Sequence, residues 1–175
     1  MLPRQVVTNS SLLSEGFTRK EIESMSAGLK LFPTPFKGIY YTPGEEEQKG
    51  KFIDKPEMVL YRAAKRYLKS DSLYFSCRTA EERWAIKWQP TTVVHMVNEK
   101  ISRTINLQIR IERNEKKKNW RAKNIARILS MYGTKIIFHK VPSIVGATVK
   151  PTPYGTYAMA SQIKKDKKRF REKEL

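Results

Sequence analysis

Cysteine and histidine are the residues best suited to bind a metal ion or to attack a substrate, and this chain contains very few of them. The sequence has one cysteine, Cys77, and two histidines, His95 and His139. A metal site needs clustered ligands, whereas 44 positions separate the histidines, so the spacing predicts neither a metal site nor a cofactor. All three residues stand in apolar runs typical of buried strands, which favours structural roles, and a single cysteine excludes an internal disulfide.

Carboxylates could serve a nuclease, which needs two or three of them around a divalent ion with a lysine close by. The nearest approach to such a cluster is residues 112–116, where Glu112 and Glu115 stand beside Lys116. The eight glycines are scattered, and no glycine-rich loop for phosphates ends in GK[ST]. The sequence therefore predicts no catalytic residues and no enzyme activity, with a small metal-dependent nuclease as the alternative that stays open.

Positive charge is the strongest feature of the composition. The chain carries 35 Lys and Arg against 17 Asp and Glu, a formal net charge of +18. A polyanion that releases counterions on binding is the simplest partner for such a surface, so nucleic acid is the first candidate. A salt-rich or hot cytoplasm, or an acidic protein partner, would also explain the charge. Without a long apolar run or a signal-type N-terminus, the protein is expected to be soluble and cytoplasmic.

Residues 16–41 predict a unit that could contact DNA. Thr18 and Glu21 form a capping box at the start of a helix over residues 18–27, and two short strands over 29–32 and 36–41 follow. A short helix followed by a β-ribbon is typical of a winged helix-turn-helix, whose helix enters the major groove; the alternative is an ordinary core segment. The predicted DNA contacts are Thr18, Arg19, Lys20 and Ser24 on the helix and Lys30 and Lys37 on the wing.

A second group of candidate contacts lies later in the chain. Between Lys100 and Arg127, ten basic residues occur with only Glu112 and Glu115. We expect residues 113–119 to form a basic loop that touches phosphates rather than bases. The candidates in this group are Arg113, Lys116, Lys117, Lys118 and Arg121.

The first of these segments also resembles a known family. The runs GFTRKEIESM, GLKL and KGIYY are similar to the N-terminal module of AbiEi-type antitoxins, which are winged helix-turn-helix transcriptional regulators. The resemblance covers mainly residues 8–41 and weakens towards residue 88. It implies a regulator that represses its own operon and is paired with a nucleotidyltransferase-like toxin. Such a module should have one more helix before the pair, for which only residues 1–7 remain.

The order of the predicted elements indicates an α+β protein of two domains. Residues 1–45 form the winged helix-turn-helix, and 56–175 a mixed α+β domain with a mainly antiparallel sheet. Residues 46–55 are the linker, because the stretch 42–55 concentrates Pro, Gly and charge, and its three consecutive glutamates, 45–47, would repel one another in any compact element. Strict alternation of apolar and polar residues predicts an antiparallel strand over 104–111. Further predicted elements are helices over 6–15, from Pro56 and over 120–132, strands over 73–77 and 143–149, and a terminal helix ending in a solvated charge run.

Three functional hypotheses follow. The first is a sequence-specific, DNA-binding transcriptional regulator of the antitoxin type, with double-stranded DNA, a cognate toxin and a second copy of the chain as partners. The second is a nucleic-acid-associated nuclease. The third is a structural protein that holds nucleic acid by charge without reading its sequence. A ratio of affinities for an operator and for random duplex separates the first from the third.

Overall fold

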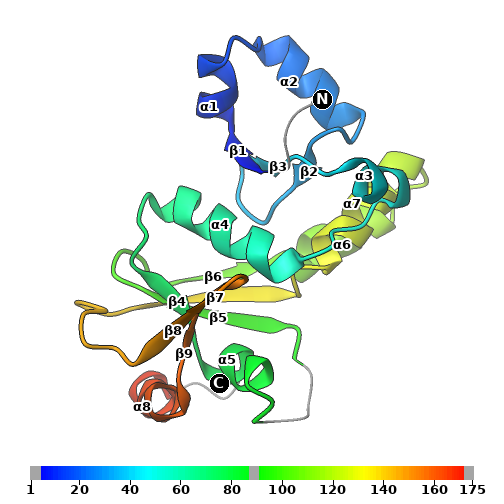
Figure 1. The fold of residues 1–175 in the computed structure, drawn as a ribbon. Coiled ribbons are helices and arrows are strands. Elements are labelled where there is room, and N and C mark those ends of the chain that lie inside the picture. Colours follow the sequence, from blue (N-terminus) through cyan, green and yellow to red (C-terminus); the bar gives the residue numbers. More distant parts are fainter. Residues whose placement is uncertain (1–4, 87–90, 172–175) are drawn as a thin grey trace. The chain divides into compact units, whose positions relative to one another are not determined.

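The computed structural model of the chain describes residues 5–86 and 91–171, which form an α+β protein (Figure 1). Within these residues there are eight helices, a three-stranded antiparallel sheet and a six-stranded mixed sheet. The predicted α+β class is confirmed. The described residues divide into two compact units: unit 1 falls within Met1–Lys69 and Leu107–Tyr132, and unit 2 within Ser70–Asn106 and Gly133–Leu175.

Unit 1 begins with a helix pair flanked by short strands. β1 (Val6–Thr8) leads into α1 (Asn9–Ser14) and α2 (Arg19–Ala27), and β2 (Phe32–Pro33) and β3 (Ile39–Tyr41) follow. The strands form an antiparallel sheet in the order β1-β3-β2. The predicted helix over 6–15 is correct only from residue 9, because β-branched residues before it favour a strand. Both predicted ribbon strands are shorter than expected.

Capping boxes fix the start of both helices. The Thr8 hydroxyl accepts the backbone N–H of Ser11 at 3.0 Å, and the Ser11 hydroxyl accepts that of Thr8 at 2.9 Å. Thr18 and Glu21 make the same exchange at 3.1 and 3.0 Å, which confirms the predicted cap. The pair packs on a small core of Val7, Leu12, Ile22 and Leu31. Burial of Ile22 therefore turns the opposite side of α2 towards solvent.

Helix α3 (Glu45–Gly50) occupies much of the stretch that was predicted to be a linker. The three consecutive glutamates therefore do not exclude a compact element. Glu47 is buried, and its carboxylate accepts hydrogen bonds from the Tyr41 hydroxyl at 2.8 Å and from the backbone N–H groups of Gly44 and Asp54 at 3.0 Å. Its neighbours Glu45 and Glu46 are exposed in the first turn, where the helix dipole favours carboxylates.

Replacing Glu47 by Ala is therefore expected to destabilise the fold. The change leaves the Tyr41 hydroxyl and two backbone donors without their acceptor, which should lower the free energy of unfolding by about 2 kcal/mol or more. Glu46→Ala is the matched control, and because that side chain is exposed its effect should stay within about 0.5 kcal/mol. Urea unfolding followed by circular dichroism measures both. Equal stability of the two variants would contradict this role of Glu47.

Three further helices complete unit 1. They are α4 (Pro56–Leu68), α6 (Leu107–Glu115) and α7 (Trp120–Ser130). α4 packs against β1 and β3, α7 contacts β2, and α6 packs along α7. The predicted helices from Pro56 and over 120–132 are confirmed. None of the helices in the described ranges is long and apolar enough to cross a membrane.

The predicted strand over 104–111 is wrong in its second half. β6 (Arg103–Asn106) ends at Asn106, and α6 begins at the next residue. An apolar pattern of period two also puts apolar residues at positions four apart, which is close to one turn of a helix. Leu107 and Ile111 are such a pair, and both are buried on one side of α6, at 0% and 3% exposure. Ile109, between them, is 55% exposed. The predicted basic loop accordingly begins inside α6, which runs to Glu115.

Unit 2 is built on the six-stranded sheet. Its order is β6-β7-β5-β4-β9-β8, with β4 (Leu73–Phe75), β5 (Val93–Asn98), β7 (Lys135–Lys140), β8 (Val149–Thr152) and β9 (Gly155–Ala158). The β5–β7 and β4–β9 pairings are parallel and the other three antiparallel, so the predicted mainly antiparallel sheet is a mixed one. The predicted strand over 143–149 begins only at Val149.

Two helices pack together on one face of this sheet. α5 (Cys77–Arg83) contacts β5 and β9, and α8 (Ala160–Phe170) contacts α5 and β9 (Figure 1). The predicted strand over 73–77 ends at Phe75, and Cys77 instead begins α5 with φ of 56°. Ser76 connects the two elements and donates its backbone N–H to the carbonyl of His95 at 3.1 Å.

Each unit is built from two separate segments of the chain, which the sequence did not indicate. Residues 56–69 and α6–α7 belong to unit 1, although we expected them in a C-terminal domain. The excursion through α6 and α7 separates β6 from β7, which nevertheless pair directly, Asn106 with Lys135. Whether residues 46–55 separate two independently folding parts stays a prediction.

Gly133 precedes β7 at a point that tolerates no side chain. Its φ is +108°, and a Cβ there would lie 2.4 Å from the backbone oxygen of Thr92. Gly133→Ala should therefore lower the free energy of unfolding by about 2 kcal/mol. Gly146→Ala is the control, because φ is +86° there too but the nearest heavy atom is beyond 4 Å; it should cost about 1 kcal/mol. An equal loss in both variants would show that the contact with Thr92 is unimportant.

Candidate nucleic-acid interface

All of the predicted DNA-contact residues are exposed and all belong to unit 1. On α2, Lys20 and Ser24 are four residues apart and share the side opposite buried Ile22. Arg19 begins the helix, and Thr18 caps it. The complete exposed set is Thr18, Arg19, Lys20, Ser24, Lys30, Lys37, Arg113, Lys116, Lys117, Lys118 and Arg121.

The turn between β2 and β3 holds Lys37 in a defined position. The Thr34 hydroxyl donates to the carbonyl of Ile39 at 2.7 Å and accepts the backbone N–H of Phe36 at 3.3 Å. Gly38 follows with φ of +78°, a conformation that glycine adopts without strain. Lys37 is thus exposed at the end of a short, hydrogen-bonded hairpin.

The charge of α2 itself is balanced. Arg19 and Lys20 are offset by Glu21 and Glu23, and Glu21 is held by the capping box at the backbone of Thr18. Carboxylates on a helix oppose phosphate binding, so α2 is better suited to contact base edges at a few positions than to supply general affinity.

The α6–α7 segment, unlike α2, has a large excess of positive charge. Residues 107–127 contain eight Lys and Arg against Glu112 and Glu115. Lys116, Lys117 and Lys118 are exposed in the connection between the helices, whose second member is capped by Asn119, with its side-chain oxygen 2.7 Å from the backbone N–H of Ala122. A strongly cationic, exposed connection of this kind suits the phosphate backbone.

Hydrogen bonds hold the α6–α7 segment against the rest of unit 1. The Arg127 guanidinium donates to the carbonyl of Gly50 at 2.8 Å. Arg110 donates to the carbonyls of Thr34 and Pro35 in the β2–β3 turn at 3.4 and 3.5 Å. Burial, and then the charge of Arg113, lowers the pKa of Arg110. The two predicted contact groups, which the sequence placed in different domains, are therefore parts of one unit.

A groove of about 550 Å³ brings one residue of each group together. Arg19 and Glu23 of α2 and Arg121 of α7 all line it. Sequence reasoning missed its other polar residues, Asn9, Ser26 and Tyr40, because they come from different elements and no spacing connects them. The lining residues are Asn9, Leu13, Arg19, Ile22, Glu23, Ser26, Tyr40 and Arg121.

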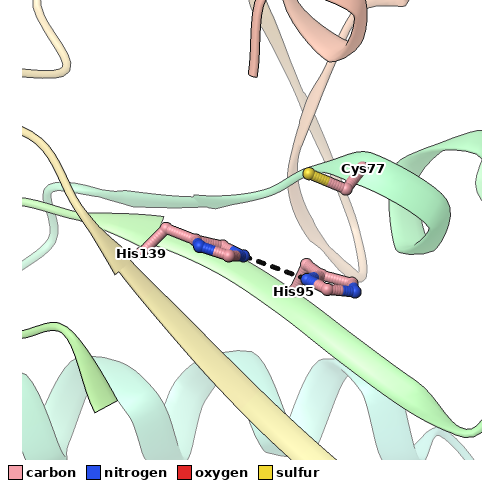
Figure 2. A group of neighbouring side chains, drawn as sticks. All are labelled: Cys77, His95 and His139. Atoms are coloured by element: carbon pink, nitrogen blue, oxygen red, sulfur yellow. Dashed lines mark hydrogen bonds between the residues drawn. The ribbon is translucent and has the colours of Figure 1, made fainter. Parts of the chain in front are cut away.

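Among the described residues, a group that could bind a metal lies in unit 2. Cys77, His95 and His139 offer ligand atoms that all lie within 4.8 Å of one another, and Figure 2 shows the two rings meeting on neighbouring strands beside Cys77. Nδ1 of His95 lies 3.0 Å from Nε2 of His139. The sequence predicted no ligand geometry here, because no local pattern specifies the parallel pairing of β5 and β7.

The sheet register explains this meeting. His95 pairs with Ile137, and Val97 pairs with His139, so both imidazoles project from the same face of adjacent strands. All three side chains are buried, with exposures of 0%, 0% and 5%. Burial, and then His95, lowers the pKa of His139 to about 4, and burial raises the pKa of the Cys77 thiol to about 12. At neutral pH His139 and Cys77 are both uncharged.

Comparison with known proteins gives no independent assignment. No protein-family model, no curated protein and no solved structure matches the chain.

Proposed function

We propose that the chain is a sequence-specific, DNA-binding transcriptional regulator whose contact surface lies in unit 1. The observation that supports this most is the arrangement of its first elements. A helix pair is inserted between β1 and the β2–β3 hairpin, and the sheet order is β1-β3-β2. The same order is expected of a winged helix-turn-helix, in which the second helix enters the major groove and the hairpin is the wing.

The separation of the candidate base contacts from the candidate phosphate contacts supports the same proposal. α2 exposes Lys20 and Ser24 on a helix of balanced charge, which favours base contacts over general attraction. Lys116, Lys117 and Lys118 supply the phosphate contacts from the same unit. Affinity and discrimination would thus come from different residues.

The resemblance to AbiEi-type antitoxins adds the biological setting. In that setting the chain represses its own operon and has a cognate toxin as its protein partner, with a second copy of the chain as a further partner. Such a module should have one more helix before the pair, whereas in the described residues the strand β1 directly precedes α1.

A non-specific nucleic-acid-binding protein is the competing function. The dense positive charge of residues 107–127 favours it, because charge alone binds any duplex. Selection from a pool of random duplexes, followed by titration at fixed salt, separates the two. For a regulator, the selected site should bind at least about 10³-fold more tightly than random duplex. Equal affinities would establish the competing function.

A further inference from the structure

The chain's only cysteine and both of its histidines come together at one buried point in unit 2. We propose that Cys77, His95 and His139 bind a single Zn²⁺ ion. A thiolate and two imidazoles are ligands of the kind that Zn²⁺ takes in proteins, and three protein ligands leave one tetrahedral position for water or another small ligand. This proposal is independent of DNA binding, which concerns the other unit.

The distances between the three ligand atoms are close to those required around one Zn²⁺ ion. Ligands on one tetrahedral Zn²⁺, at about 2.0–2.3 Å from it, lie roughly 3.3–3.6 Å apart. The facing nitrogens of His95 and His139 are already 3.0 Å apart, and the ligand atoms of all three residues lie within 4.8 Å. Movements of about 1 Å, within the reach of side-chain rotation, would bring all three to one ion.

Binding of Zn²⁺ requires one proton to leave the site and one hydrogen to change its position. Binding replaces the Cys77 S–H bond by a sulfur–zinc bond, and the thiol proton leaves to solvent. One of the two facing histidine nitrogens carries the hydrogen of their 3.0 Å hydrogen bond, and that ring must move this hydrogen to its other nitrogen so that both lone pairs face the ion.

The surroundings hold the three ligands in place. The backbone N–H of His95 donates to the Thr79 hydroxyl of α5 at 2.9 Å, which ties the strand to the helix that begins at Cys77. The ring of Phe170 stacks on His139 with centroids 4.1 Å apart and planes at 11°. Packing of this kind fixes ring orientation, which a metal site requires of its outer shell.

The test uses the full-length chain without a tag, reduced and freed of metal with a chelator. Titration with Co²⁺, a coloured substitute for Zn²⁺, is expected to produce a thiolate-to-cobalt charge-transfer band that saturates at a single ion per chain and disappears when Zn²⁺ is added. Since Cys77 is the only cysteine in the sequence, the band can come from no other residue. Absence of the band with the folded protein would overturn the proposal.

Variants test each ligand against ordinary packing. Cys77→Ser and His139→Gln should weaken binding at least about 100-fold. Ile137→Val is the control, because Ile137 is a buried neighbour that pairs with His95 but offers no ligand atom; it should bind fully. Wild-type affinity in Cys77→Ser would refute the site.

A measurement on the wild-type chain covers the case in which the variants do not fold. The sequence contains only two histidines, so long-range ¹H–¹⁵N spectra show two imidazoles. Saturating Zn²⁺ should shift the ring nitrogens of both. Unchanged imidazole signals would overturn the proposal without any variant.

Discussion

Asp166→Ala is expected to lower the free energy of unfolding by about 3–5 kcal/mol. The Asp166 carboxylate of α8 is fully buried and accepts hydrogen bonds from Ser76 at 2.6 Å, Tyr74 at 3.0 Å and Gln162 at 3.0 Å. Burial, and then the charge of Asp166, raises the pKa of Tyr74, so its hydroxyl remains a donor. Alanine removes the acceptor of the Ser76 and Tyr74 hydroxyls and leaves the Gln162 amide only its long contact to the Tyr74 hydroxyl, at 3.5 Å.

Two further variants make this result specific. Asp166→Asn keeps one oxygen for Tyr74 and Ser76 but turns an NH₂ group towards Gln162, so its loss should be smaller than that of alanine. Lys165→Ala, on the exposed side of the same helix, should change stability by no more than about 0.5 kcal/mol. Urea unfolding gives all three values. If Asp166→Ala were as stable as Lys165→Ala, this network would not hold α8 to β4.

Replacing both Lys117 and Lys118 by Gln is expected to weaken binding to every duplex, by about 10- to 100-fold at 0.1 M salt. The slope of log affinity against log salt should fall by roughly one unit for each lysine, because each phosphate contact releases counterions. The loss should be the same for the selected site and for random DNA. Salt titrations on both duplexes give the slopes.

The control for this prediction removes the same charge elsewhere. Lys164 and Lys165 are exposed on α8 of unit 2, and replacing both by Gln lowers the net charge equally. Their replacement should leave the salt slope nearly unchanged. A similar fall in slope for both pairs would mean that total charge, rather than a surface of unit 1, governs affinity.

Local signals predicted two of the three helices that carry the proposed interface, α2 and α7, but not α6. The capping box of Thr18 and Glu21 and the helical spacing after it located α2, and one-sided apolar residues located α4 and α7. The period-two pattern of residues 105–111 failed, because Leu107 and Ile111 satisfy a strand and a helix equally well. The packing of this segment along α7, which is a tertiary contact, selects the helix over the strand.

The burial of charged side chains could not be predicted from the sequence either. Glu47 stands in a run of glutamates and Asp166 in a run of lysines, where both suggested solvated surface. Their burial depends on partners such as Tyr41 and Tyr74, which tertiary structure brings to them. The meeting of His95 and His139 depends likewise on a parallel pairing that no local pattern specifies.

The most direct test of the proposed function is the ratio of affinities for the selected and the random duplex in Arg19→Ala and Lys20→Ala. If α2 enters the major groove, each change should lose roughly 1–3 kcal/mol against the selected site, relax discrimination at one base position and leave random-duplex binding almost unchanged. Lys165→Ala, with the same charge change on α8, should keep the full ratio. A wild-type ratio in both α2 variants, together with loss of all binding in the Lys117 and Lys118 variant, would contradict sequence reading by α2.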